Sequence, residues 1–230
     1  MRNDWPATTV GAPTPVRNGL EVVAGLVDAY AGRNPVESVA VVGNAPVPPD
    51  PERAAAIDAA DLVVRVNGFA LDGPQHPRGL GTRADVVVTQ WALEATPWVF
   101  ADYRSRLYLY NEPGMMYADV ERLPAWWPPD LGLAPIPNRE VNQPLSRALG
   151  FDPAQPRWAT TGTVAAWLVR LLYPDARLLL AGFSFIWTPV QTTWDHAYGG
   201  ASALTGDHEL IAEATMLRSW IEDGSAEYLR

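Results

Sequence analysis

The 230-residue chain contains no cysteine and no lysine, and all 17 of its basic residues are arginine. The lack of cysteine excludes disulfides, thiolate metal ligands and cysteine nucleophiles. The lack of lysine excludes lysine Schiff-base chemistry and phosphate loops of the Walker type. No apolar run is long enough for a transmembrane helix, and the proline-containing first twenty residues lack the apolar core of a signal peptide.

The charge balance and several missing motifs narrow the function further. A net charge of −9 argues against nonspecific binding to nucleic acid or anionic membranes, although it leaves room for a small anionic ligand in a local site. There is no G-x-G-x-x-G fingerprint, no Asp-x-Asp pair after a strand and no G-x-S-x-G elbow. The arginine-only, Ala/Pro/Gly-rich composition is typical of GC-rich bacterial genomes, so we expect a bacterial protein. Because neither a transmembrane helix nor a signal peptide is apparent, we expect it to be soluble and cytoplasmic.

Apolar runs bounded by turn residues predict alternating strands and helices after a loose tail at 1–17. This alternation predicts one Rossmann-like α/β domain over 18–230, with a doubly wound, mostly parallel sheet and helices on both faces. The predicted strands are 38–42, 61–66, 85–89, 107–110 and 177–183, and the predicted helices are 18–33, 51–60, 93–102, 162–173 and 207–223.

The segment 111–157 interrupts this alternation. It contains nine prolines and the pair Trp126 and Trp127, which predict a long irregular excursion. Such a segment is either a lid or binding loop, or a stretch of chain that wraps the surface.

Polar residues follow the predicted strands where ligands bind in sheets of this type, at the carboxyl ends. Asn44 and Asn67 each come directly after a buried strand, and each is either a ligand-binding amide or a turn residue. Thr160, Thr161 and Gly162 open an apolar helix. Free N–H groups and hydroxyls at a helix start favour an anion such as phosphate, although threonine capping alone also explains them.

The chain has only three histidines, two of which flank a glycine-rich stretch. His208 lies at a predicted helix start, where an imidazole can act as a general base. The alternative for His208 and for His196 is an ordinary surface or capping role. Two histidines without cysteine or matched carboxylates make a weak metal site, so we expect no metal.

Taken in order, these segments resemble the motifs of the sialyltransferases of the eukaryotic Golgi and their bacterial relatives, glycosyltransferase family 29. The resemblance covers about 40–85 and 158–213. The small motif has threonine here where the family has serine. The large motif resembles Ala40-Val41-Val42-Gly43-Asn44, Ile57-Asp58, the stretch from Asp61 to Asn67 with Arg65, and Gly81-Thr82-Arg83. The other motifs resemble Thr160-Thr161-Gly162 through Ala181-Gly182-Phe183, Trp194 to Tyr198, and the H-x4-E pair His208 and Glu213.

The resemblance implies an inverting, metal-independent glycosyltransferase without a cofactor. It would move a sialic-acid-like or other sugar from a CMP-activated donor to a hydroxyl of a glycan, small-molecule or lipid-linked acceptor. It implies that His208 is the general base, that His196 supports the leaving phosphate, and that Glu213 helps in positioning. It further implies a CMP site made by Asn44, Asn67, Thr160, Thr161, Gly162, Gly182, Phe183 and Tyr198, with Gly43 in support.

The chain departs from the family in three respects: the family's disulfide cannot form, a membrane anchor and stem are not apparent, and the chain is short. Two other functions therefore stay open. One is a non-catalytic module that binds CMP or another nucleotide. The other is an enzyme that uses the same pocket for donor hydrolysis or another group transfer.

Overall fold

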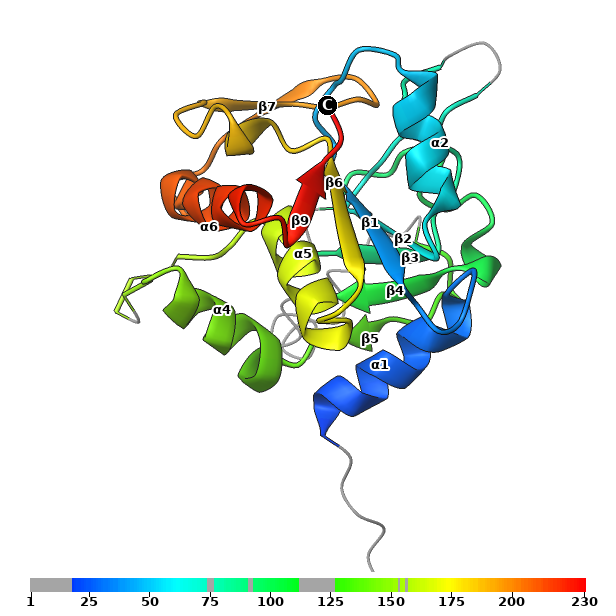
Figure 1. The fold of residues 1–230 in the computed structure, drawn as a ribbon, viewed down its shortest axis with the longest axis horizontal. Coiled ribbons are helices and arrows are strands. Elements are labelled where there is room, and N and C mark those ends of the chain that lie inside the picture. Colours follow the sequence, from blue (N-terminus) through cyan, green and yellow to red (C-terminus); the bar gives the residue numbers. More distant parts are fainter. Residues whose placement is uncertain (1–17, 74–76, 91–92, 112–126, 153, 156) are drawn as a thin grey trace, which may run out of the picture.

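A computed structural model describes residues 18–73, 77–90, 93–111, 127–152, 154–155 and 157–230. Its centre is a seven-stranded sheet with the order β5-β4-β3-β2-β1-β6-β9, in which every neighbouring pair is parallel (Figure 1). The chain builds the sheet outward from β1 to β5 and then returns to the other side of β1 with β6. The predicted doubly wound α/β fold is therefore confirmed. The strands are β1 (Ser38–Val42), β2 (Leu62–Val66), β3 (Val86–Thr89), β4 (Leu107–Tyr110), β5 (Ala134–Pro135), β6 (Arg177–Ala181) and β9 (Ala226–Tyr228).

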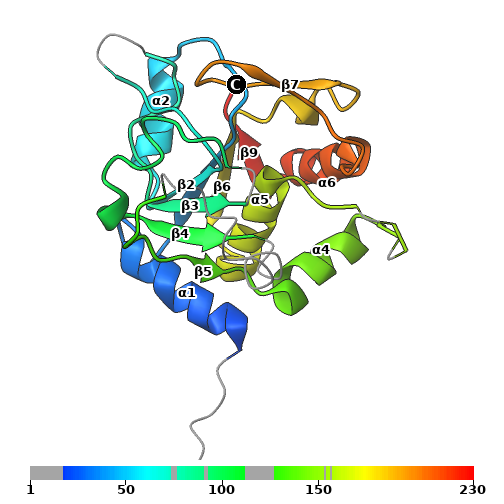
Figure 2. The same ribbon diagram turned by 180° about the vertical axis from the view of Figure 1, so that it is seen from behind.

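Helices cover both faces of the sheet. On one face, α1 (Gly19–Tyr30), α5 (Thr161–Leu172) and α6 (Leu210–Glu222) contribute to a single apolar core. On the other face, α2 (Pro51–Ala59) inserts Ile57 into a smaller cluster with Ala40, Val42 and Val63. Figures 1 and 2 both show the strands lying between α2 and α6.

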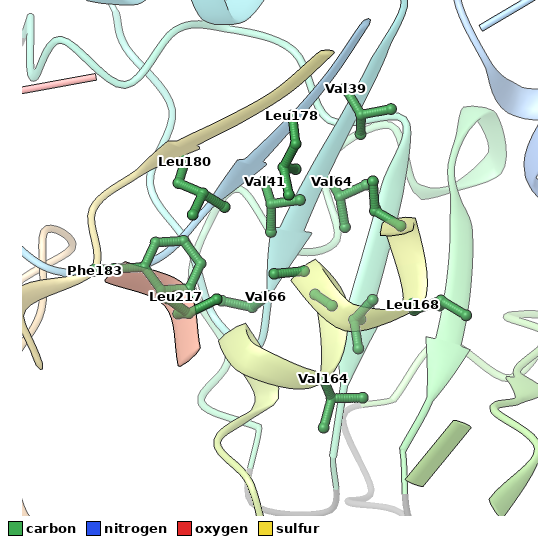
Figure 3. Packing of buried hydrophobic residues seen from close by; sticks show 14 of the residues in the cluster. Val39, Val41, Val64, Val66, Val164, Leu168, Leu178, Leu180, Phe183 and Leu217 are labelled. Atoms are coloured by element: carbon green, nitrogen blue, oxygen red, sulfur yellow. The ribbon is translucent and has the colours of Figure 1, made fainter. Parts of the chain in front are cut away.

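The sequence of the central strands explains why both faces are covered. Val39 and Val41 of β1 belong to the core under α5, whereas Ala40 and Val42 belong to the cluster under α2. A parallel strand buried on both faces is apolar at every position, because neither side meets water. Figure 3 shows the result at α5, whose Val164 and Leu168 pack beside β2.

Several polar residues of the large motif hold the first strand–helix–strand unit together. Asp61 accepts hydrogen bonds from the backbone N–H of Ser38 at 2.9 Å and from its hydroxyl at 2.8 Å. Arg65 is 1% exposed and donates to the backbone carbonyls of Arg83 at 2.9 Å and Leu80 at 2.7 Å. Burial lowers the pKa of Arg65 to about 10. These contacts link the strands below the carboxyl edge, so the two motif residues Asp61 and Arg65 are structural.

The predicted helix at 93–102 is wrong. The described part of this segment forms turns, followed by a short 3-10 helix, Tyr103–Ser105. Pro97 lies in the middle of the segment, where it removes a helical donor and disfavours helical angles at the preceding residue. That residue, Thr96, instead donates its hydroxyl to the carbonyl of Phe69 at 2.7 Å.

The predicted irregular excursion at 111–157 is wrong in part. It contains strand β5, a π-helix (Asn138–Asn142) and α4 (Gln143–Ala148). Trp126 and the two prolines that precede it in this segment, Pro113 and Pro124, lie outside the described residues, as does the tail predicted at 1–17. The stretch 184–206, in which no strand or helix is predicted, contains a hairpin of β7 (Thr193–Asp195) and β8 (Ala201–Ala203), which lies above α6 in Figure 1. The last helix begins at Leu210, three residues later than predicted.

The carboxyl ends of β1 and β6 approach each other so closely that only glycine fits. A Cβ on Gly43 would collide with the carbonyl of Gly182, and one on Gly182 would lie 2.7 Å from the carbonyl oxygen of Gly43. Gly182 also has a φ of +70°, a conformation that side chains disfavour.

We therefore expect Gly43→Ala to lower the free energy of unfolding by about 1–3 kcal/mol, as overpacked sites do. Denaturant unfolding of the variant and the wild type measures this. The control is Gly25→Ala in α1, because a Cβ there meets no atom within 4 Å. It should be neutral or slightly stabilising, since alanine is the better helix former. Equal unfolding midpoints for Gly43→Ala and the wild type would contradict the close approach.

Candidate functional site

Two asparagines lie side by side in the sheet at the carboxyl ends of β1 and β2. The Nδ2 of Asn44 donates to the carbonyl of Val66 at 2.9 Å, which ties the end of β1 to the end of β2. Asn67 has a φ of +49°, and its Nδ2 donates to the hydroxyl of Thr161 at 3.3 Å. Its Oδ1 is buried and has no hydrogen-bond partner in the described chain. A buried amide oxygen without a partner is costly, so it marks a place where a donor group of a ligand would fit.

The start of α5 lies against Asn67. Thr160 caps the helix, because its hydroxyl accepts the N–H of Thr163 at 3.3 Å. The N–H groups of Thr161 and Gly162 belong to the first turn, where no intrahelical acceptor exists. With the hydroxyl of Thr161, they offer donors at the positive end of the helix dipole, the arrangement that suits a phosphate.

Phe183, which is predicted to belong to the CMP site, places its ring in the apolar core under the start of α5. The residue is 2% exposed and belongs to the apolar core, where Figure 3 shows it near Leu217. A Cβ at Gly162 would lie 2.7 Å from the Phe183 ring, so only glycine lets this ring approach the first turn of α5. Gly182 likewise packs against Gly43, and both glycines shape the floor of the site.

A buried carboxylate of α6 also holds this helix start. Glu213 of α6 is fully buried, and its Oε2 accepts the N–H of Thr160 at 2.9 Å and the Thr160 hydroxyl at 2.7 Å. Its Oε1 has no partner among the described residues. Burial raises the pKa of Glu213, although the nearby Thr163 hydroxyl, the hydrogen bonds from Thr160 and the neighbouring His208 act in the opposite direction.

His208 precedes α6 and is fixed by the backbone next to α5. Its Nδ1 lies 2.8 Å from the carbonyl oxygen of Trp158, and the N–H of Trp158 donates to the carbonyl of Asp207 at 2.8 Å. Since a carbonyl can only accept, this contact assigns the proton of the neutral ring to Nδ1 and the lone pair to Nε2. The ring edge also contacts Trp194, with centroids 6.4 Å apart. Nε2 is therefore the atom of His208 that can accept a proton.

The four residues 158–161 connect these parts. Trp158 contacts His208, Thr160 contacts Glu213, and Thr161 contacts Asn67. The imidazole and the asparagine amides therefore lie on the same rim of the sheet.

The hairpin brings a second histidine to this edge. The N–H of Ala197 donates to the carbonyl of Asn44 at 2.7 Å. The rings of His196 and Tyr198 stack with centroids 4.8 Å apart, and His196 Nε2 lies 3.2 Å from the Ser202 hydroxyl. Burial lowers the pKa of His196, whereas burial and then the nearby Glu94 carboxylate raise the pKa of Tyr198 to about 12. Both rings are thus uncharged near neutral pH.

Other polar residues at this edge were not predicted from the sequence. Arg78 donates to the carbonyl of Ala197 at 3.2 Å and lies over the Trp98 ring at 4.9 Å. Asn111 directly follows β4, so the rule that selected Asn44 and Asn67 applies to it equally. Arg78 lies in a predicted loop and does not directly follow a strand, so this rule could not have selected it.

The rim thus combines asparagine amides and the donors at the start of α5 with two imidazoles and the guanidinium of Arg78. Among the residues with described positions, no three His, Asp or Glu side chains are grouped so that they could hold a metal ion. The described helices include none that is long and apolar enough to cross a bilayer.

Comparison with protein-family models and with curated protein sequences gives no match. Comparison with solved structures gives a mammalian sialyltransferase at a TM-score of 0.56 and 15% identity, over 94% of this chain and 81% of that one. A mammalian sialyltransferase in complex with Gal-beta-1-3GalNAc-ortho-nitrophenol matches at a TM-score of 0.57 and 14% identity over the same shares. The chain therefore has the fold of mammalian sialyltransferases, at low sequence identity.

Proposed function

We propose that this protein is an inverting glycosyltransferase that transfers a sialic-acid-like sugar from a CMP-activated donor to an acceptor hydroxyl. The observation that carries this proposal is the position of α5. Its first turn contacts Asn67 through the Thr161 hydroxyl. The residues just before this turn contact Glu213 and, through the Trp158 carbonyl, His208. A helix start suited to an anion and an imidazole with a free lone pair therefore lie on one rim, and the fold is that of sialyltransferases.

The donor phosphate would lie at the start of α5. There the N–H groups of Thr161 and Gly162 and the Thr161 hydroxyl would donate to its oxygens, and the amides of Asn44 and Asn67 would contact the phosphate and ribose region. His196 would support the phosphate from the hairpin, with Tyr198 stacked beneath it. Fixed donors and a helix dipole stabilise the charge of departing CMP without a metal, because they need no reorganisation as the bond breaks.

The base would act on the acceptor. Nε2 of His208 takes the proton of the acceptor hydroxyl while the oxygen of that hydroxyl forms a bond to the anomeric carbon of the donor sugar. The bond from that carbon to the phosphate oxygen breaks, and CMP leaves with the electron pair. Attack on the face opposite the leaving group inverts the configuration. The second structural neighbour is in complex with a compound that contains Gal-beta-1-3GalNAc, which supports a saccharide acceptor for this chain too.

The nucleotide assignment is tested by binding. We expect CMP, among CMP, CDP, UDP, GDP and AMP, to raise the melting temperature most. Saturating CMP at a hundredfold excess over Kd stabilises by about 2.7 kcal/mol, which is about 5–10 °C for a chain of this size.

Asn67→Asp should weaken CMP binding about 10-fold or more, since aspartate tolerates the left-handed backbone but places a negative charge beside the phosphate. The matched control is Asn18→Asp, the same charge change at the N-cap of α1, where aspartate caps equally well. The same loss of CMP affinity in both variants, or no loss in either of them, would count against the assignment. Donor turnover without an acceptor would favour hydrolysis instead of transfer.

A further inference from the structure

A second cluster of neutral amides lies at the carboxyl end of β4, outside the residues assigned to CMP. Asn111 is 7% exposed, and its Oδ1 accepts from the Nδ2 of Asn142 at 2.9 Å. The same Nδ2 donates to the Oδ1 of Asn138 at 2.7 Å. The Oδ1 of Asn142 is buried without a hydrogen-bond partner, and the Nδ2 of Asn111 donates to no residue, as far as the chain is described. The pair therefore presents one unused acceptor and one unused donor.

Two features set this pair apart from ordinary turn asparagines. Buried amide groups are nearly always paired in native proteins, because an unused one destabilises the fold. Asn142 also ends the π-helix Asn138–Asn142, a type of helix that is rare and is found frequently at functional sites. Both features concern Asn142, and both are expected where a ligand, rather than the chain, supplies the hydrogen bond that its buried Oδ1 lacks.

The strand register places the pair beside the candidate donor site. Val66 pairs with Val88 and Thr89 pairs with Tyr110, so the residues that follow β2 and β4 extend from the same edge. Two strand spacings, about 10 Å, separate them. The π-helix also packs against α5, whose start contacts Asn67. A separation of about 10 Å between Asn67 and Asn111 leaves room for a sugar next to the phosphate.

We propose that Asn111 and Asn142 bind the hydroxyl groups of the sugar that lies next to the donor phosphate; this inference rests on the proposed function. A sugar hydroxyl both donates and accepts, so it can donate to Asn142 Oδ1 and accept from Asn111 Nδ2. Neither amide carries a charge, so the subsite selects a hydroxyl-bearing face of the ligand. The sugar belongs either to the donor or to the acceptor, and the two sources are separated by the probes below.

The test is calorimetry on the full chain. CMP, CMP-sialic acid and lactose are each titrated alone as well as together. The variant is Asn142→Leu, which keeps the size of the side chain and removes both polar atoms. CMP affinity should stay unchanged. Affinity for CMP-sialic acid should fall about 3- to 10-fold if the donor sugar is bound, or affinity for lactose by the same factor if the acceptor sugar is bound. The control Gln143→Leu removes an exposed amide one residue further on and should change none of the three.

Unchanged binding of both sugar probes by Asn142→Leu would overturn the subsite. If this variant does not fold, judged by circular dichroism, Asn111→Ala removes the other half of the pair and is expected to show the same loss. If the wild-type protein binds no CMP, the proposed function is refuted instead. The separate titrations of CMP-sialic acid and lactose would then still decide whether the sugar subsite exists.

Discussion

Replacing His208 by alanine should reduce sugar transfer by about 10²- to 10⁴-fold, the range for loss of a general base. The contact between Nδ1 and the Trp158 carbonyl leaves Nε2 as the proton-accepting atom of the ring, and alanine has no atom that can accept a proton there. Glutamine at this position can still donate a hydrogen bond to that carbonyl, but its amide is not basic enough to act as a general base. His208→Gln should therefore be as inactive as His208→Ala.

CMP binding separates this result from misfolding. We expect both His208 variants to bind CMP with the wild-type affinity, because the proposed donor site consists of Asn44, Asn67 and the start of α5. Initial rates of CMP release from CMP-sialic acid in the presence of an acceptor measure the loss. A rate within a few-fold of the wild type would show that another group removes the proton.

Removal of the Glu213 carboxylate should have the second largest effect. Glu213→Ala leaves the buried N–H and hydroxyl of Thr160 without their acceptor, at about 1–3 kcal/mol for such a group. The start of α5 would then shift, and a displacement of about 1 Å can cost roughly 10²-fold in rate. Glu213→Gln retains an oxygen acceptor, so it should recover most of the transfer activity. Glu222→Gln, on the exposed end of α6, is the control and should behave as the wild type.

The raised pKa of Glu213 gives this prediction a pH signature. Folding favours its protonated form, so its contribution to stability falls as the pH rises above its ordinary value of 4.5. Glutamine does not titrate. The melting temperature of Glu213→Gln should therefore rise relative to the wild type between about pH 4 and pH 7. If the melting temperatures of the variant and the wild type change in parallel across that pH range, the pKa of the Glu213 carboxyl is not raised by folding.

Much of the fold is predictable because its central strands are local apolar runs. The stretch Ser38–Val42 is apolar on both faces, and Asp50 with Pro51 marks the start of α2 as a capping residue followed by proline should. The short strands β5 and β9 carry no such signal, since two or three residues cannot show a period. Their pairing depends on β4 and β6, which lie far away in the sequence.

The candidate site is predictable only in its residue types. Strand ends and a threonine-rich helix start identify Asn44, Asn67 and Thr161 as ligand-binding candidates. The bond between Thr160 and Glu213 joins residues 53 positions apart, so it exists only once α5 and α6 pack together. The same holds for the tautomer of His208, which depends on a backbone carbonyl 50 residues away.

A crystal structure of the CMP complex tests the central claim most directly. The phosphate should lie within hydrogen-bond distance of the Thr161 hydroxyl and the Asn67 amide, with Nε2 of His208 facing the open side of the phosphate. CMP bound in the surface cleft between α1 and β4, which Tyr30 and Arg106 help to line, would contradict the account, as would a phosphate remote from the start of α5.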